Sequence, residues 1–458
     1  MLQTISRKNP IDIIVNLLFL ALFAFAIIFH EERLLADSGY YLLQLINNQN
    51  FIVEHNRFIL ILSQWLPLIA VKIGLPLKQV ILLYSIGHWL FFYIIYLVCR
   101  YNYANKEAGI LLVLLQTLGI ASGFFTPMFE LYYGAALLVL FACVLYHSPH
   151  KISSWIILIL TAFFAVTGHP FSNFLLLFIL ALHALEFRFQ YVKQYIIIIL
   201  VIIVLFIFKM NAASEYEQGK SQAFLDTLKN GVYNLDYLGG LMHFLAKYYM
   251  AMMLLFTLPV FYFISRKKYS FLGLYVITFL GMLALVNVSS YGFEQSRYQE
   301  QVYFPLTFIV AYTICLFVLK EVKYRLALVS VIVIIFIFRL NAIWNDGMNF
   351  RTRVETMKDL INTAQHLPGN KFVVSEAYVL SQSKIHPNWS FPIETMLLSA
   401  ANTNKTVTIC TDADMNFDDN KSRIKPSEYL FRRWEIYPVN SLNMKYFQMD
   451  KTGYYNIE

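Results

Sequence analysis

Long apolar runs alternate with short polar segments over the first 340 residues of the chain. A transmembrane helix needs roughly 20 apolar residues, and fewer where the bilayer is thin. By this criterion the pattern predicts eleven membrane spans, over residues 11–29, 80–99, 108–124, 131–146, 152–167, 171–185, 191–208, 248–264, 271–288, 302–319 and 326–340. The predicted fold class is therefore an α-helical polytopic membrane protein with about eleven transmembrane helices.

One further apolar run, residues 58–77, is interrupted by polar residues and by two prolines. If this run does not cross the membrane, the basic loops all lie on one side and the acidic residues lie on the other, as the positive-inside rule requires. If the run crosses, every later basic loop moves to the outer side. We therefore predict that residues 58–77 form a helix in the outer interface of the cytoplasmic (inner) membrane, with the N-terminus of the protein in the cytoplasm.

Composition supports a membrane protein and argues against a nucleic-acid partner. Hydrophobic residues make up 58% of the chain and charged residues only 14%, which is too apolar for a soluble domain. The net charge of +8 arises mostly from short basic clusters between apolar runs, which is typical of cytoplasmic loops. The four cysteines lie far apart, so they indicate neither a disulfide framework nor a thiolate metal site. The first apolar run is followed by His-Glu-Glu instead of a cleavage site, which predicts a retained span.

The pattern changes near Ala342, where the long apolar runs stop. Acidic and basic residues balance over residues 344–458, and the odd number of preceding spans places this segment outside the cell. Helical spacing at 354–367 and 393–401, with strand-like stretches at 371–377 and 406–411, predicts a small α/β domain. We therefore divide the chain into a transmembrane domain, residues 1–343, and an extracytoplasmic soluble α/β domain, residues 344–458.

Three carboxylates follow the first predicted span: Glu31, Glu32 and Asp37. Asp37 lies about eight residues beyond the span, within the outer headgroup zone. A carboxylate at a partly dehydrated interface has a raised pKa and can take a proton from a hydroxyl or amine as a new bond forms. The alternative is that the three acids form only a solvated flank of the span.

The order of polar motifs in the outer loops gives a further signal. The segment DSGYY (residues 37–41) precedes the polar run NNQN (residues 47–50) and then HNRF (residues 55–58), which opens the predicted interfacial helix. Between the third and fourth predicted spans, SGFFTPMFELYYG carries Glu130, and Arg297-Tyr298 followed by Pro305 opens the tenth. In this order the motifs resemble the GT-C membrane glycosyltransferases, a group that contains protein O-mannosyltransferases and lipid A aminoarabinose transferases. His55 and the final Gly74 match the family pattern, whereas Asn56 and Arg57 stand where the family has two prolines.

The resemblance implies an enzyme that moves a sugar from a polyprenyl-phosphate donor, itself a membrane lipid, to an extracytoplasmic acceptor by inverting displacement. The acceptor is a lipid, a glycan or a protein. In this role Asp37 is the general base, and Glu130 assists it or orients the acceptor. The alternative for Glu130 is a structural acid that is hydrogen-bonded to nearby groups.

Negative charge grows on the leaving phosphate as the glycosidic bond breaks, so a fixed cation at the outer face stabilises the transition state. The candidates for binding the donor phosphate are, in order, Arg297, Lys247 and Arg57. The alternative for Arg297 is contact with lipid headgroups or pairing with Glu294. Support of the site or contact with the acceptor is predicted for Glu294, Tyr40, Tyr41, His55 and Tyr298.

No metal ligands are predicted, because no second ligand stands at a metal-binding spacing from the candidate histidines. Some GT-C enzymes use a divalent cation, but a lone Asp37 without an adjacent Asp-x-Asp favours the metal-free type. Asp412 and Asp414 form an Asp-x-Asp after a strand-like run, as in nucleotide-sugar transferases. The surrounding domain is small and has no glycine-rich phosphate loop, so we expect these two acids to lie in a solvated loop.

Two other functions remain as alternatives. A polymerase or ligase of lipid-linked polysaccharide is also polytopic, but it is expected to carry a long, arginine-rich central outer loop in place of the early acid and the interfacial helix. A lipid or sugar transporter or flippase places charged residues at the middle of the membrane and often shows inverted repeats. In this sequence the acids cluster outside the spans, which favours the glycosyltransferase over the transporter.

Overall fold

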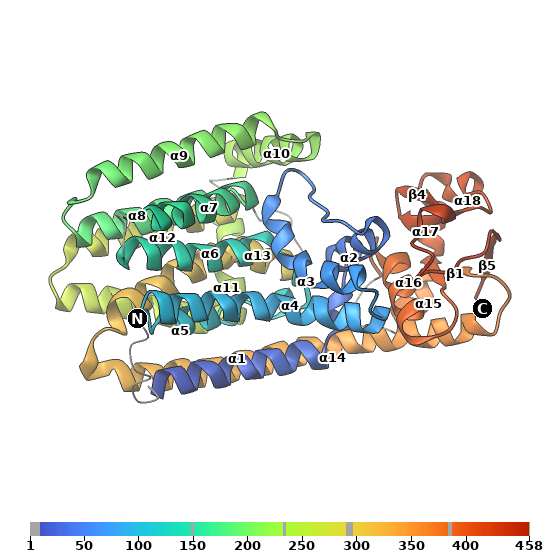
Figure 1. The fold of residues 1–458 in the computed structure, drawn as a ribbon, viewed down its shortest axis with the longest axis horizontal. Coiled ribbons are helices and arrows are strands. Elements are labelled where there is room, and N and C mark those ends of the chain that lie inside the picture. The colour runs from blue at the N-terminus through green and yellow to red at the C-terminus, as the bar shows by residue number, and fades with distance from the viewer. Residues whose placement is uncertain (1–9, 148–150, 232–234, 290–295, 383–386, 458) are drawn as a thin grey trace.

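A helix forms within each of the eleven predicted apolar runs, because a chain surrounded by apolar groups must satisfy its backbone hydrogen bonds internally. The computed structural model describes residues 10–147, 151–231, 235–289, 296–382 and 387–457. The helices of the bundle are α1 (Pro10–Ile28), α4 (Leu77–Leu97), α5 (Ala108–Leu115), α6 (Glu130–His147), α7 (Ile152–Gly168), α8 (Phe171–Glu186), α9 (Val192–Asn211), α11 (Leu235–Ser265), α12 (Tyr269–Ser289), α13 (Ser296–Thr313) and α14 (Val322–Gln365). They run mostly along the long axis of the molecule (Figure 1).

Eight of the helices in the described part of the chain are long and apolar enough to cross a membrane, and three other apolar helices are shorter. In α9 and α14, less than a third of the apolar stretch is buried within the protein. Val204 and Phe338 are 63% and 71% exposed on these helices. Large exposed apolar surfaces of this kind are typical of helices that contact lipid or another protein. The prediction of a mainly helical chain with apolar helices of membrane length is confirmed, whereas the number of eleven spans stays a prediction.

The predicted span at residues 108–124 is helical only as far as Leu115. Beyond it the chain turns, and two charged side chains bind the backbone groups of this buried segment. Arg339 of α14 donates to the carbonyls of Thr117 and Ile120, both at 2.9 Å. Glu300 of α13 accepts from three consecutive backbone N–H groups, those of residues 121–123. A non-helical segment inside a bundle is stable only with such partners, so this pair of buried charges explains why the helix ends early.

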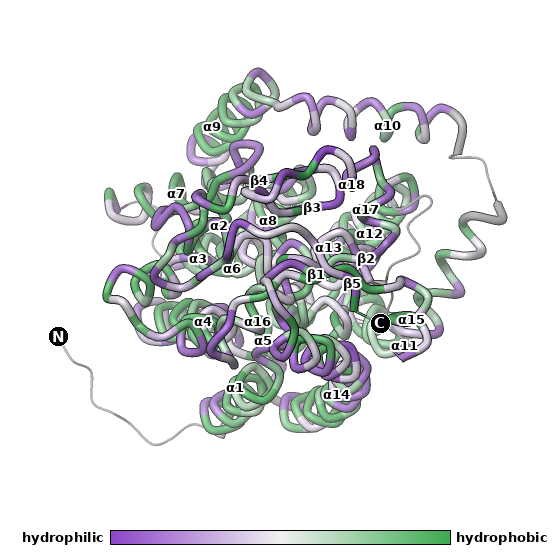
Figure 2. Tube along the Cα trace, turned by 90° about the vertical axis from the view of Figure 1, so that its right-hand side faces the viewer, coloured by the Kyte–Doolittle hydropathy of each residue, from purple (hydrophilic) through white to green (hydrophobic). Residues whose placement is uncertain are grey.

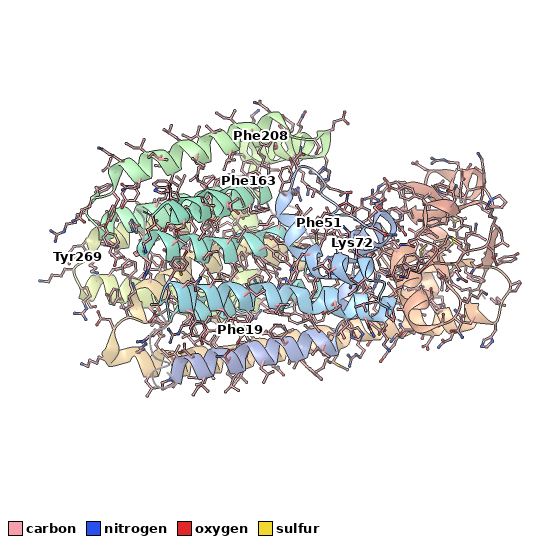
Figure 3. The ribbon with its side chains drawn as sticks, viewed as in Figure 1. Phe19, Phe51, Lys72, Phe163, Phe208 and Tyr269 are labelled. Atoms are coloured by element: carbon pink, nitrogen blue, oxygen red, sulfur yellow. The ribbon has the colours of Figure 1, made fainter. Side chains whose placement is uncertain are left out.

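The residues between α1 and α4 form a separate layer at one end of the bundle. They fold into α2 (Asp37–Asn48), a short 3-10 turn (Phe58–Leu60) and α3 (Ile61–Lys72), which packs on α2 and α4. Phe51 and Lys72 mark this end in Figure 3, next to the C-terminal domain. The predicted interfacial helix is therefore a helix of 12 residues that ends before Gly74, whose φ is +76°. A further helix, α10 (Glu215–Gly231), extends across the same end (Figure 2).

Several basic residues lie at the opposite end of the bundle, which Tyr269 marks in Figure 3. They form ion pairs of 2.5–2.7 Å with acids at neighbouring helix ends: Arg100 with Asp12, Arg325 with Glu107, and Arg266 with Glu321. Basic loops that are far apart in the sequence therefore lie together, at the end that is distant from the C-terminal domain.

The C-terminal domain contains a small sheet flanked by helices. Its elements are β1 (Lys371–Val374), α15 (Glu376–Gln382), α16 (Phe391–Asn402), β2 (Thr408–Thr411), α17 (Asp412–Asn416), α18 (Asn420–Arg423), β3 (Glu428–Arg432), β4 (Glu435–Pro438) and β5 (Tyr454–Asn456). Three parallel strands lie in the order β2-β1-β5, and β3 and β4 form an antiparallel hairpin. A small C-terminal sheet is thus confirmed. The helix predicted at 354–367 is not a separate element, because α14 continues from the bundle to Gln365 without a break.

Candidate functional site

The three acids after α1 have different partners. Glu31 binds Lys358 Nζ at 2.5 Å, and Glu32 binds Arg351 Nε at 2.8 Å. Both cations belong to the part of α14 that extends beyond the bundle. Glu31 and Glu32 therefore attach the first loop to α14 and are structural, whereas Asp37 begins α2 and faces a different helix, α13.

Asp37 meets the start of α13 through a hydrogen bond. The hydroxyl of Tyr298 donates to Asp37 Oδ2 at 3.4 Å, and Arg297 Nη2 donates to the same hydroxyl at 3.3 Å. Burial raises the pKa of Asp37; Arg297 opposes this shift, Glu130 adds to it, and the Tyr298 hydrogen bond opposes it. Asp37 as a residue nevertheless keeps intermediate exposure. The structure thus brings three predicted site residues together around one carboxylate of raised pKa.

Arg297 is suited to binding an anion. Its side chain is 7% exposed and lies over the Tyr298 ring, with 4.7 Å between the guanidinium carbon and the ring centre. Its Nε is buried and has no hydrogen-bond partner in the described part of the chain. A buried guanidinium with an unused donor gains a strong, charge-assisted hydrogen bond when a phosphate oxygen reaches it. The predicted partner Glu294 lies outside the described residues.

Arg57 and Glu130, for which the sequence predicted separate roles, form an ion pair with 2.7 Å between Nη1 and Oε1. Arg57 Nε also binds Glu217 of α10 at 3.2 Å, and Gln301 Nε2 donates to the second oxygen of Glu130 at 3.2 Å. Burial alone would lower the pKa of Arg57, but the two carboxylates outweigh it and raise that pKa. Arg57 is thus neutralised by two acids, and it binds a phosphate only if it exchanges one of them.

Lys209, at the end of α9, completes this group with its Nζ 4.0 Å from Glu217. Sequence analysis missed both Glu217 and Lys209 as members of the site. Lys209 carried a signal, because it is the only charge in a long apolar run after residue 193 and such a charge usually has a specific partner. The sequence could not identify Glu217 as the partner of Lys209, because only the folded structure shows that α10 lies next to the end of the bundle.

Tyr40 and Tyr41 bind the loop that precedes α3. Both hydroxyls donate to Glu54, that of Tyr41 at 3.2 Å. On its other side the ring of Tyr40 faces Arg432 of the β3–β4 hairpin, whose guanidinium carbon lies 4.5 Å from the ring centre. Tyr40 therefore joins the loop before α3 to the C-terminal domain, whereas the Tyr41 hydroxyl binds that loop through Glu54.

His55 contacts α10 and not Asp37. Its Nδ1 lies 2.8 Å from the Ser214 hydroxyl, and its ring stacks on Tyr216 with 4.6 Å between centres. Burial and the charge of Arg57 lower the pKa of His55. Lys247 is exposed on α11 and lies 5.0 Å from the Tyr248 ring; within the described residues it makes no contact with Asp37 or Arg297. The structure therefore does not bring Lys247 next to Asp37 or Arg297.

The Asp-x-Asp of the C-terminal domain is structural. Asp414 is 1% exposed, accepts the backbone N–H of Thr411 at 3.1 Å in a capping box, and pairs with Arg433 at 2.7 Å. Asp412 accepts the backbone N–H of Glu376 at 2.8 Å. The expectation of a solvated loop is wrong, because both acids lie in α17, where Asp414 completes a capping box with the N-cap residue Thr411. Across the described ranges, no group of three or more His, Cys, Asp or Glu side chains is placed to hold a metal ion.

Comparison of the chain with protein-family models, with curated proteins and with solved structures finds no match. The assignment of a function therefore depends on the geometry of the site and on the resemblance of its motifs.

Proposed function

We propose that the protein is a membrane glycosyltransferase that moves a sugar from a polyprenyl-phosphate donor to an extracytoplasmic acceptor. The observation that carries this proposal is the connection of Asp37 to Arg297 through the Tyr298 hydroxyl. It combines a base of raised pKa with a buried cation whose Nε has no partner among the described residues, and the transfer reaction needs both a base and a stabilising cation. The resemblance to GT-C enzymes gives the same roles to these residues.

In the proposed membrane arrangement, the eight long apolar helices together with α5, α7 and α8 form eleven spans. The N-terminus then lies in the cytoplasm, and the C-terminal domain lies outside. The layer of α2, α3 and α10 lies at the outer membrane surface, where the headgroup of an embedded donor lipid projects. The collection of basic residues at the opposite end supports this orientation.

The chemical step is a single displacement. The acceptor oxygen or nitrogen forms a bond to the anomeric carbon on the face opposite to the phosphate, while the bond between this carbon and the phosphate oxygen breaks. Asp37 takes the proton from the acceptor, and the bonding electrons leave with the polyprenyl phosphate. Arg297 stabilises the charge on that leaving group, and Glu130, held by Arg57, contributes to the raised pKa of Asp37.

The proposal is tested with the protein in lipid nanodiscs and a panel of radiolabelled polyprenyl-phosphate sugars. Release of polyprenyl phosphate is measured in the presence of cell-envelope fractions as acceptors. The Asp37→Asn variant is expected to fold normally and to lose about 100-fold or more in rate, as for other general bases. Asp359→Asn is the matched control, because Asp359 is exposed on α14. Wild-type rates for Asp37→Asn would remove Asp37 from the mechanism, and no turnover of any donor by the wild type would refute the function.

A further inference from the structure

A side chain of the C-terminal domain binds the backbone directly before Asp37. Glu394 of α16 accepts the N–H of Ala36 at its Oε1, with 3.1 Å between the two atoms. The Ser390 hydroxyl donates to the same oxygen at 2.5 Å, and Arg353 of α14 pairs with the other carboxylate oxygen. Glu394 and Arg353 are 1% and 3% exposed. A buried carboxylate with three partners therefore lies next to the proposed base.

The backbone of Ala36 explains why this carboxylate is needed. Ala36 has a φ of +51° and a ψ of −120°, a conformation that residues other than glycine rarely adopt. Its carbonyl accepts the N–H of Tyr40 at 3.1 Å at the start of α2, while its own N–H points to Glu394. Such a conformation persists only where surrounding groups hold it. Glu394 binds the N–H of Ala36, which belongs to the peptide unit before its Cα, while Tyr40 binds the carbonyl of the peptide unit after it.

The segment from Ala36 to Gly39 is tightly packed. A Cβ atom on Gly39 would lie 2.4 Å from the Leu34 carbonyl oxygen and 3.6 Å from Glu394 Cγ. The first turn of α2 is thus packed between the preceding loop and α16. Because Asp37 is the first residue of α2, the direction of its side chain follows from the conformation of Ala36.

Burying an ion pair costs desolvation free energy, and apolar residues in its place often stabilise a fold as well or better. The pair of Arg353 and Glu394 is therefore better explained by what it orients than by stability. Arg353 belongs to the same helix as the last proposed span. The chain of contacts leads from α14 through Arg353 and Glu394 to Ala36, and then to Asp37.

We propose that Glu394 is a positioning residue that sets the orientation of the Asp37 carboxylate through the Ala36 peptide, so that the C-terminal domain completes the active site. This inference rests on the proposed function for its catalytic consequence. Its geometric part, that Glu394 determines the environment of Asp37, is independent of that function.

The first test measures transfer kinetics of Glu394→Gln in nanodiscs. We expect kcat to fall about 10- to 100-fold, as for other small displacements of a catalytic group, with the donor KM unchanged. In the Asp37→Asn background the same substitution is expected to cause no additional loss, because it acts only through Asp37. Equal losses in both backgrounds would overturn the proposal. Glu31→Gln is the matched control: it makes the same chemical change, in the loop that precedes Asp37, and also removes a pair with α14, but it leaves the bond between Glu394 and Ala36 in place.

The second test does not require transfer. Dicyclohexylcarbodiimide modifies protonated carboxyl groups in apolar surroundings, and peptide mass spectrometry gives the rate of modification at Asp37. We expect this rate to change in Glu394→Gln and to equal that of the wild type in Glu31→Gln. Unchanged reactivity in a folded Glu394→Gln protein would overturn the proposal, whether or not the protein is a transferase.

If Glu394→Gln does not fold, Ser390→Ala provides the test, because it removes one of the three partners of the carboxylate and keeps the ion pair. We expect Ser390→Ala to change the carbodiimide rate at Asp37 and to lower kcat by a smaller factor. A folded Ser390→Ala protein with wild-type values of both would contradict the proposal.

Discussion

The hydroxyl of Tyr298 donates a hydrogen bond to Asp37 Oδ2 over 3.4 Å, although the two residues are 261 positions apart in the sequence. This contact joins the first turn of α2 to the first turn of α13. It also determines how the proposed base responds to pH, because a hydrogen bond to a carboxylate favours its charged form.

Replacing Tyr298 by phenylalanine is expected to raise the pKa of Asp37 further. The proposed base works only when it is deprotonated, so the acidic limb of the pH profile of kcat/KM moves to higher pH in Tyr298→Phe. At alkaline pH, where Asp37 is charged in both proteins, the difference becomes small. Tyr93→Phe is the control, since Tyr93 binds Asn16 on α1. A limb that moves to lower pH would show that Asp37 is not the titrating base.

Arg297→Ala is expected to weaken the binding of a polyprenyl phosphosugar. A hydrogen bond to a charged group contributes roughly 1.5–3 kcal/mol, which corresponds to a loss of about 10- to 150-fold in affinity. Binding is measured by titration of the donor into nanodiscs, with Arg423→Ala in the C-terminal domain as an exposed control. Unchanged donor affinity in Arg297→Ala would make Arg297 structural.

The ion pair between Arg57 and Glu130 predicts a stability effect that is separate from catalysis. Arg57→Ala leaves Glu130 buried without its main partner, so the free energy of unfolding is expected to fall by about 3 kcal/mol. Thermal and denaturant unfolding in mixed micelles measures this loss. Adding Glu130→Gln removes the unpaired charge, so the double variant is expected to lose less than the sum of the single variants.

The control for this prediction is the pair of Arg266 and Glu321 at the other end of the bundle, whose side chains are 52% and 28% exposed. Arg266→Gln is expected to change stability by less than about 1 kcal/mol, because solvent screens such pairs. A similar loss at both pairs would show that burial of the Arg57 pair is energetically unimportant.

Cysteine labelling tests the proposed orientation. The four native cysteines are buried, so single cysteines introduced at exposed positions report on accessibility. Ser441→Cys in the C-terminal domain is expected to react with a membrane-impermeant maleimide in intact cells after outer-membrane permeabilisation. Ser153→Cys, near the start of α7, is expected to react only after the inner membrane is opened. The reverse pattern would invert the topology and place Asp37 on the cytoplasmic side.

Much of the fold could be predicted because it depends on local sequence pattern. The helices follow apolar runs, and the strands at 371–374 and 408–411 follow alternation, both of which are readable within a short window. The early end of α5 could not be predicted in this way. It results from Arg339 and Glu300, which belong to other helices and bind the backbone of residues 117–123. A charge inside an apolar run indicates that such a contact exists, but the sequence does not show which residue is the partner.

The candidate site, like the fold, could be predicted only in part from the sequence. Asp37, Tyr298 and Arg297 could be selected from their places at the ends of predicted spans and from the resemblance of their motifs to those of GT-C enzymes. The pairing of Arg57 with Glu130, and the roles of Glu217 and Glu394, depend on which helix ends meet in space. Sequence distance gives no information about this, since Glu394 lies 358 residues beyond Ala36.

The 44 residues of α14 form one helix of about 66 Å at 1.5 Å per residue, which enters the C-terminal domain without a linker. Each residue added to such a helix turns everything after it by about 100°. A single-residue insertion near Trp344 would therefore rotate Arg353 away from Glu394 while leaving the amino-acid composition of both parts almost unchanged. Any chimaera that exchanges the C-terminal domain has to preserve this helical phase, and evolution of the domain is subject to the same constraint.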